Sequence, residues 1–164
     1  MERTIIFIRH AKSAYANMGQ SDFDRPLNER GERDAPTMGK RLADKKLLPH
    51  LILSSTAKRT TQTAKKIAAE VGYDKDAIQW VDKLYLASQE IITEIVEAID
   101  DKHCIVFLIA HNPGITYMVN SLNPWLKIDN VPTCGMVACS FTAKHWNDFT
   151  KTDKKILFFD YPKN

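Results

Sequence analysis

Three polar dipeptides each follow an apolar run of the chain closely, and their residue types suit the chemistry of phosphate. They are Arg9-His10, Lys58-Arg59 and His111-Asn112. An arginine guanidinium keeps its charge and matches two phosphate oxygens at once, so Arg9 and Arg59 together suit a dianion. A neutral histidine can attack phosphorus through a ring nitrogen and form a phosphohistidine that water later hydrolyses. This set therefore predicts phosphoryl transfer, with His10 as the nucleophile.

Each of these residues also has a plain structural interpretation when it is taken alone. Arg59 could be a charge on a helix surface, and His111 could shape a turn before Asn-Pro-Gly. An arginine-histidine pair after a strand often lies on the surface without a function. The shared position of the dipeptides after apolar runs favours one common site, in which the arginine cations should keep His10 neutral.

The apolar runs have the composition of buried β-strands. Six strands are expected, at Thr4–Ile8, Leu51–Leu53, Ile78–Val81, Cys104–Ala110, Met136–Phe141 and Ile156–Phe159. The fourth of them is apolar throughout instead of alternating, which is typical of a strand that helices bury on both faces.

Helices are expected between these strands. Their predicted ranges are Asn28 to about Lys46, Lys58 to Val71, Ser88 to about Ile99 and Pro113 to about Leu122, with Gly72 as a C-cap. This alternation predicts one domain over residues 1–164, a three-layer α/β/α sandwich with a mostly parallel central sheet. Ligands bind beyond the carboxyl ends of such strands, so the three dipeptides should converge there.

Composition excludes several other classes of protein. The 164 residues carry 23 basic and 20 acidic side chains, and the net charge of +3 is spread along the chain, unlike the basic stripe of a nucleic-acid-binding protein. The longest apolar run is far shorter than the ~20 residues that span a bilayer, so no membrane partner is expected. We expect a cytoplasmic protein whose cysteines are reduced.

The remaining histidines and the cysteines do not predict a metal centre. His50, His103 and His145 do not follow strands, and no carboxylate or cysteine joins them at ligand spacing. The three cysteines form no C-x-x-C pair and are expected in the core. The sequence therefore predicts catalysis without a metal or another cofactor.

Three segments together resemble the histidine phosphatase superfamily, which is also called phosphoglycerate mutase-like. They are Ile6–Ala11 (IFIRHA), Ser54–Ala64 (SSTAKRTTQTA) and Ile109–Pro113 (IAHNP). The segments DRPLNERG at Asp24–Gly31 and LYLA at Leu84–Ala87 are most similar to its SixA-type phosphohistidine phosphatase branch. The resemblance runs from about Thr4 to Asn120.

The resemblance implies that His10 is the nucleophile, that Arg9 and Arg59 bind phosphate, and that His111 contacts the phosphoryl oxygens. It also implies that Arg25 is a further phosphate or substrate contact, although this side chain could equally pair with Asp22 or Asp24. No acidic segment matches the proton donor that phosphomonoesterases of the superfamily use. The nearby candidates for that role are Asp24, Asp82 and Glu90.

The missing acid affects the expected substrate. An alkoxide leaving from a phosphate ester needs a proton, and a positioned general acid is typically worth roughly 10² to 10⁴ in rate. A phosphoramidate releases an imidazole that solvent can protonate. We therefore expect a phosphatase that acts on a phosphorylated protein of the histidine phosphotransfer type and releases inorganic phosphate. The alternatives are a phosphatase of a small metabolite and a non-catalytic phosphate-binding module.

Overall fold

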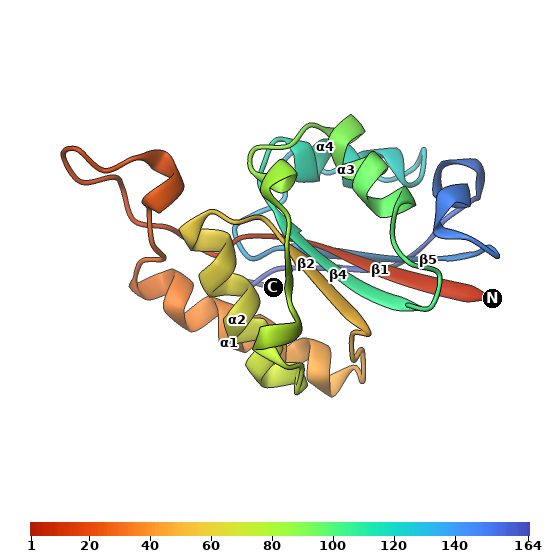
Figure 1. Cartoon of the computed structure of the whole chain (residues 1–164), viewed down its shortest axis with the longest axis horizontal. Helices are drawn as coiled ribbons and strands as arrows, with labels where there is room; N and C mark the ends of the chain where they lie inside the picture. Colours follow the sequence, from red (N-terminus) through yellow and green to blue (C-terminus); the bar gives the residue numbers. More distant parts are fainter.

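Six strands form one sheet in the computed structural model, which describes all residues from 1 to 164 (Figure 1). They are β1 (Glu2–Arg9), β2 (Leu51–Ser54), β3 (Gln79–Trp80), β4 (Ile105–Ala110), β5 (Met136–Thr142) and β6 (Lys155–Asp160), in the order β3-β2-β4-β1-β5-β6. The first four in this order are parallel to one another, whereas β5 runs antiparallel to β1 and β6 antiparallel to β5. The expected mostly parallel sheet is thus confirmed, with an antiparallel exception at β5.

Helices cover both faces of this sheet. The helices α1 (Glu29–Asp44) and α2 (Lys58–Val71) pack together on one face, and α3 (Gln89–Glu97) and α4 (Gly114–Ser121) lie on the other (Figure 1). Strand β1 shows why its sequence is continuously apolar. Ile5 and Phe7 belong to the core cluster beneath α3 and α4, whereas Ile6 and Ile8 belong to the cluster beneath α1 and α2. The predicted three-layer α/β/α sandwich is therefore confirmed.

The helix boundaries follow local capping chemistry. The Asn28 side chain accepts a hydrogen bond from the Gly31 backbone at 2.9 Å and begins α1. Ser88 does the same for α3, and Gly72 ends α2 with a left-handed φ of 72°. Helix α4 begins one residue later than expected, because Pro113 is its N-cap residue instead of its first helical residue.

The strand expected at Ile78–Val81 is shorter than predicted. Only Gln79 and Trp80 pair with β2, and both are exposed at the edge of the sheet. Ile78 ends a short 3-10 turn and Val81 precedes another, so neither residue continues the ladder.

The segment between β1 and α1 projects away from the sheet (Figure 1) and contains a 3-10 turn at Asp22–Asp24. An isolated bridge between Ser13 and Leu27 holds the base of this projection together. Elsewhere, Cys134 and Cys139 are buried in the core, as expected, whereas Cys104 is only partly buried because it lies just before the start of β4. No helix has the length and apolar character needed to cross a membrane.

Candidate active site

The carboxyl ends of β1, β2 and β4 open into one cavity of about 220 Å³. The structure brings all five predicted residues to it: Arg9, His10, Arg25, Arg59 and His111. Lys12, Ser13, Leu86, Asn112 and Thr133 complete the lining. The convergence that the strand ends predicted is therefore what the structure has.

His10 lies one residue beyond β1, and backbone hydrogen bonds hold it in place. Its backbone N–H donates to the Ala110 carbonyl at 3.2 Å, and its carbonyl accepts from the Cys134 N–H at 2.9 Å. The next residue, Ala11, donates its N–H to the Thr63 hydroxyl of α2 at 3.0 Å. These bonds hold the imidazole between the sheet and α2 at the mouth of β1.

The hydrogen bonds of the His10 ring define its tautomer. Nδ1 lies 2.7 Å from the carbonyl oxygen of Ala11, which can only accept, so Nδ1 carries the hydrogen. Burial, together with the charges of Arg59, Arg9 and Arg25, lowers the pKa of His10 to about 3. The ring is therefore neutral near pH 7, and Nε2 has a free lone pair, which is the state a nucleophile requires.

Arg59 is 4% exposed and lies in the first turn of α2 beside that lone pair. Its Nε donates to His10 Nε2 across a long 3.4 Å contact. Its Nη1 donates to the Asp22 carbonyl at 2.7 Å, and its Nη2 donates to the Asp22 carboxylate at 3.0 Å. Asp22, in the segment that projects between β1 and α1, thus holds the Arg59 guanidinium beside His10.

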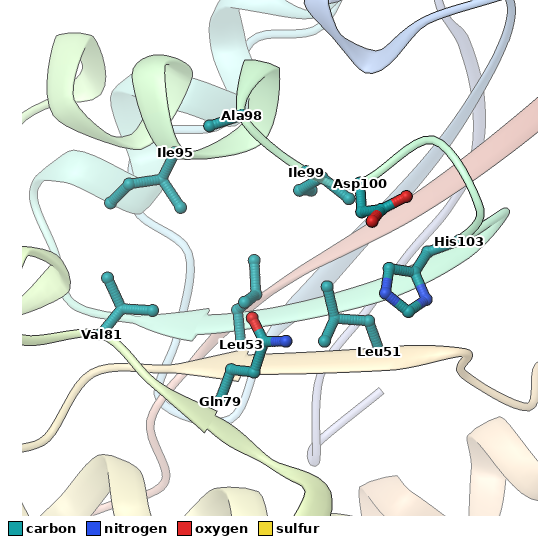
Figure 2. A pocket seen from close by; sticks show the side chains of 9 residues that line it. All are labelled: Leu51, Leu53, Gln79, Val81, Ile95, Ala98, Ile99, Asp100 and His103. Atoms are coloured by element: carbon teal, nitrogen blue, oxygen red, sulfur yellow. The ribbon is translucent and has the colours of Figure 1, made fainter.

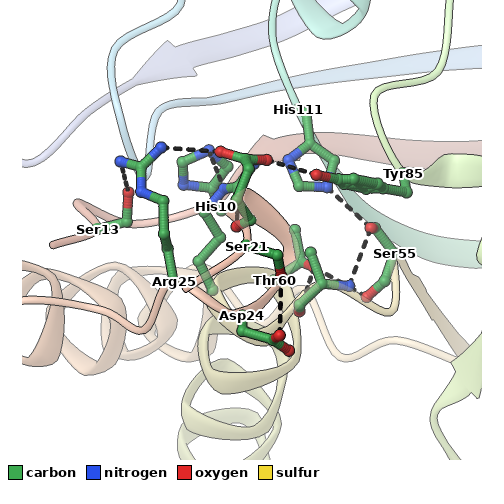
Figure 3. Close-up of polar contacts among 12 residues, drawn as sticks. His10, Ser13, Ser21, Asp24, Arg25, Ser55, Thr60, Tyr85 and His111 are labelled. Carbon is green, nitrogen blue, oxygen red and sulfur yellow. Dashed lines mark hydrogen bonds and ion pairs between the residues drawn. The ribbon is translucent and has the colours of Figure 1, made fainter. Parts of the chain in front are cut away.

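Arg9 and His111 each leave a buried nitrogen without a hydrogen-bond partner. Arg9 donates from Nη1 to the Val131 carbonyl at 2.9 Å, but its Nε is unpaired. His111 Nε2 lies 2.8 Å from the Ser55 hydroxyl, and its Nδ1 is unpaired (Figure 3). A buried unsatisfied polar atom typically costs about 1–3 kcal/mol. Both atoms belong to residues that line the cavity.

His111 is also neutral and packs between two other rings. Burial above all, then the neighbouring His10 and the charge of Arg59, lowers the pKa of His111 to about 3. Its ring centroid lies 5.3 Å from that of His10 and 5.3 Å from that of Tyr85, which meets it edge-on. His111 can therefore offer hydrogen bonds to a phosphoryl group without adding a charge.

Asp22 is the site residue that sequence reasoning did not single out. Its carboxylate accepts from the hydroxyl of Tyr85, from Arg59 Nη2 and, at 2.9 Å, from Arg25 Nη1. These bonds, that from Tyr85 above all, lower the pKa of Asp22 far below its usual range. The i, i+3 spacing of Asp22 and Arg25 was the available signal, but the contacts to Arg59 and Tyr85 are long-range.

The three candidates for a general acid lie elsewhere. The Asp24 carboxylate accepts from the Ser21 hydroxyl at 2.8 Å, Asp82 begins a 3-10 turn, and Glu90 lies in the first turn of α3. None of the three lines the phosphate-sized cavity. The carboxylate of Asp22, in contrast, bonds to Arg25 and Arg59 of the cavity.

A second hollow, of about 300 Å³, lies at the β2–β3 edge beneath α3 (Figure 2). Leu51, Leu53 and Ile95 give it an apolar lining, with Asp100 and His103 at one end. It contains no guanidinium or lysine, so it has no means of neutralising a phosphate dianion.

Comparison with known proteins agrees with this site. Residues 5–84 match the model described as the histidine phosphatase superfamily, branch 1. An uncharacterized protein of Mycobacterium tuberculosis is 30% identical over 165 residues, which cover 95% of this chain and 100% of that protein. The chain belongs to the histidine phosphatase superfamily. Membership of this superfamily supports phosphatase activity.

Other relatives of this histidine phosphatase extend the comparison. An uncharacterized chloroplastic protein of Arabidopsis thaliana is 37% identical over 86 residues, or 52% of this chain, and this chain spans only 39% of the plant protein. A crystal structure assigned as the phosphohistidine phosphatase SixA of Agrobacterium tumefaciens has a TM-score of 0.80 at 29% identity, with 98% of each chain covered. The architecture is therefore of the SixA type.

A more distant structure shares the fold alone. The mycobacterial glucosyl-3-phosphoglycerate phosphatase has a TM-score of 0.69 at 18% identity, over 97% of this chain and 99% of its own. Phosphatases that act on different substrates thus share this fold, so the fold alone does not identify the substrate.

Proposed function

We propose that this phosphatase removes the phosphoryl group from phosphohistidine in a protein, through a covalent intermediate on His10. The expected partner is a cytoplasmic phosphotransfer protein of a signalling or sugar-uptake system. The likeness to SixA supports this substrate class. The remaining support comes from the chemistry of the cavity.

The observation that carries the proposal is the state of Asp22. This carboxylate reaches the arginines of the cavity, but two guanidiniums and a phenol hold it ionised, so it has no proton to give a leaving group. An ester needs that proton, and a positioned acid typically contributes roughly 10² to 10⁴ in rate. The imidazole of a phosphohistidine can take its proton from solvent. The site is therefore better suited to a P–N bond than to a P–O bond.

The proposed reaction has two steps. In the first, the His10 Nε2 lone pair forms a bond to phosphorus while the P–N bond of the substrate breaks, and the departing imidazole takes a proton from solvent. Arg59 Nε, which donates to that nitrogen in the structure, turns to a phosphoryl oxygen. The unpaired nitrogens of Arg9 and His111 gain phosphoryl oxygens as partners.

In the second step, water attacks phosphorus and the bond to His10 breaks, which releases inorganic phosphate. The hydrogen stays on Nδ1, hydrogen-bonded to the Ala11 carbonyl, in both steps, so the phosphorylated ring is an imidazolium. Hydrolysis then expels a neutral imidazole, which is a far better leaving group than an imidazolide. The Ala11 carbonyl thus serves both steps by keeping one proton in place.

The proposal also assigns charge neutralisation to the protein alone. Arg9, Arg25 and Arg59 line the cavity and can compensate a phosphoryl dianion. Turnover should therefore persist in EDTA. A loss of turnover that added magnesium or zinc restores would contradict this part of the proposal.

The discriminating experiment compares substrates on one enzyme preparation. A phosphohistidine-bearing phosphotransfer protein and a panel of phosphate esters are incubated with the wild type and with His10→Ala. We expect kcat/KM on the phosphohistidine protein to exceed that on every ester by at least 10²-fold, the low end of what a general acid contributes. Comparable rates on an ester such as a sugar phosphate would favour the metabolite phosphatase. Phosphate binding without any turnover would favour the non-catalytic module.

A further inference from the structure

A third hollow adjoins the phosphate cavity. Its apolar part is formed by Leu86, Ala87, Pro113 and Tyr117, and its polar part by Ser88, Gln89 and Glu90. It measures about 490 Å³ and is bordered by Leu86, Pro113 and Tyr117, with Glu90 as its single charged residue. Leu86 lines both hollows, so the two are adjacent. We call the surface formed by residues 86–90, 113, 114 and 117 the shelf.

The backbone of Leu86 presents its side chain to solvent. Leu86 has a φ of 50°, in the left-handed region that is unfavourable for a residue with a Cβ atom, and it is 57% exposed. Such a conformation persists where the surroundings impose it, and it is concentrated at functional sites. The 3-10 turn at Asp82–Leu84 precedes it, and Ala87 donates its N–H back to the Leu84 carbonyl at 3.2 Å.

The floor of the shelf is rigid. The backbone of Gly114 at the start of α4 packs so closely on the Ala87 carbonyl that a Cβ at this glycine would overlap the oxygen. Helices α3 and α4 are in contact on the same face of the sheet (Figure 1). The two segments that form the shelf are thus held together before any ligand arrives.

Tyr117 supplies the outer wall. Its neighbours Ile115, Met118 and Val119 are buried in the core, whereas Tyr117 is 60% exposed and faces the hollow. Tyrosine combines a large apolar body with little conformational entropy to lose, which is why it is enriched at interfaces.

We propose that the shelf is the docking surface for an apolar side chain beside the phosphohistidine of the protein substrate; this inference rests on the proposed function. The 220 Å³ cavity has room for a phosphoryl group and an imidazole ring, so the polypeptide that carries the ring lies outside it, and the shelf adjoins the cavity at Leu86. The cations of the site all lie on the cavity side, and the shelf has none. Its one charge, the Glu90 carboxylate, disfavours an anionic group, and the side chains of Leu86, Pro113 and Tyr117 match an apolar group attached to the phosphorylated residue.

The test compares two substrates and three variants. Tyr117→Ser removes the outer wall, and Tyr117→Phe keeps its apolar body. Trp125→Ser is the matched control, because Trp125 is an aromatic residue that is 88% exposed and lines no hollow. The kcat/KM of each variant is measured on a histidine-phosphorylated phosphotransfer protein and on free phosphohistidine. Thermal unfolding verifies that each variant is folded.

We expect Tyr117→Ser to lower kcat/KM roughly tenfold on the protein and to leave it unchanged on free phosphohistidine. Tyr117→Phe and Trp125→Ser should match the wild type on both. Equal activity of Tyr117→Ser and wild type on the protein would overturn the shelf while leaving the proposed function standing, as would an equal loss on both substrates. A wild type that is inert on both substrates would overturn the proposed function and, with it, the shelf.

Discussion

The phosphate cavity and the hollow at the β2–β3 edge are similar in size and opposite in chemistry. The first has about 220 Å³ and is lined by three arginines and two histidines, whereas the second has about 300 Å³ and a mainly aliphatic lining (Figure 2). The larger and more apolar of these two hollows is therefore not the one suited to phosphate. The difference shows that the position of a residue relative to its strand decides what it can do.

Residues within a strand and residues just beyond it have different tasks. Leu51 and Leu53 of β2 alternate onto one face of the sheet and line the apolar hollow as part of the core. His10 and His111 each follow their strand by one residue, where the side chain does not belong to the apolar core. In a parallel sheet these positions meet at one edge, so each strand contributes a reactive group to the same place.

The first prediction contrasts one histidine from each hollow. His10→Ala should lower kcat by at least about 10⁴-fold, because loss of a nucleophile leaves only binding and electrostatic stabilisation. His103→Ala, in the apolar hollow, should leave kcat unchanged. The affinity of His10→Ala for inorganic phosphate, measured by calorimetry, should stay close to that of the wild type. A His10→Ala enzyme with substantial turnover would remove the distinction between the two hollows.

The second prediction concerns Arg59, which donates to His10 Nε2 and to the carbonyl and carboxylate oxygens of Asp22. Arg59→Ala should lower kcat by about 10² to 10³-fold, as is typical when a preorganised donor to the developing charge is lost. Affinity for phosphate should fall as well, because the same guanidinium binds the ground state. Arg59→Lys keeps the charge without the planar fork and should give an intermediate kcat. Steady-state kinetics with phosphate as a competitive inhibitor separates the two effects.

The sequence predicted the parts of this site that depend on local pattern. Strand ends, caps and residue types were sufficient to bring Arg9, His10, Arg59 and His111 together, and the resemblance added Arg25. The role of Asp22 was out of reach, because it depends on how the projecting segment folds back onto Arg59 and on Tyr85, 63 positions further along the chain. The direction of β5 was also out of reach, because hydrophobic periodicity carries no information about strand direction.

The third prediction uses the buried histidines of the cavity. Both pKa values fall to about 3 in the folded protein, whereas an unfolded chain titrates near the ordinary value of 6.5. The unfolded state therefore takes up protons first, so the free energy of unfolding should be constant above about pH 6.5 and fall as pH decreases toward 3. Each histidine contributes a slope of about 1.4 kcal/mol per pH unit.

Denaturant unfolding between pH 8 and pH 4 measures this slope. His111→Gln should have a shallower dependence than the wild type, because one titrating group is gone. His103→Gln should change the slope less, since His103 is only partly buried. Identical slopes for the wild type and His111→Gln would show that His111 is not held neutral by the fold.

The fourth and smallest prediction concerns the charge of Asp22. Asp22→Asn removes the carboxylate charge that partly neutralises Arg25 and Arg59, so inorganic phosphate should inhibit about fivefold more strongly, through a Coulomb effect at the partly exposed site. Asp24→Asn is the matched control, because Asp24 bonds to Ser21 and does not reach the cavity arginines. Weaker phosphate inhibition in Asp22→Asn would mean that positioning of Arg59, not charge, is what Asp22 provides.

A rapid quench with radiolabelled phosphohistidine protein tests whether His10 forms a covalent intermediate. We expect a brief reaction to leave label on the wild-type enzyme, and this label should survive alkali and be lost in acid, as a phosphoramidate is. His10→Ala should acquire none. If the wild type acquires no label, even under conditions that slow its hydrolysis step, then water attacks the substrate directly and His10 is a binding residue. Label that resists acid, or label on a residue other than His10, would contradict the account equally.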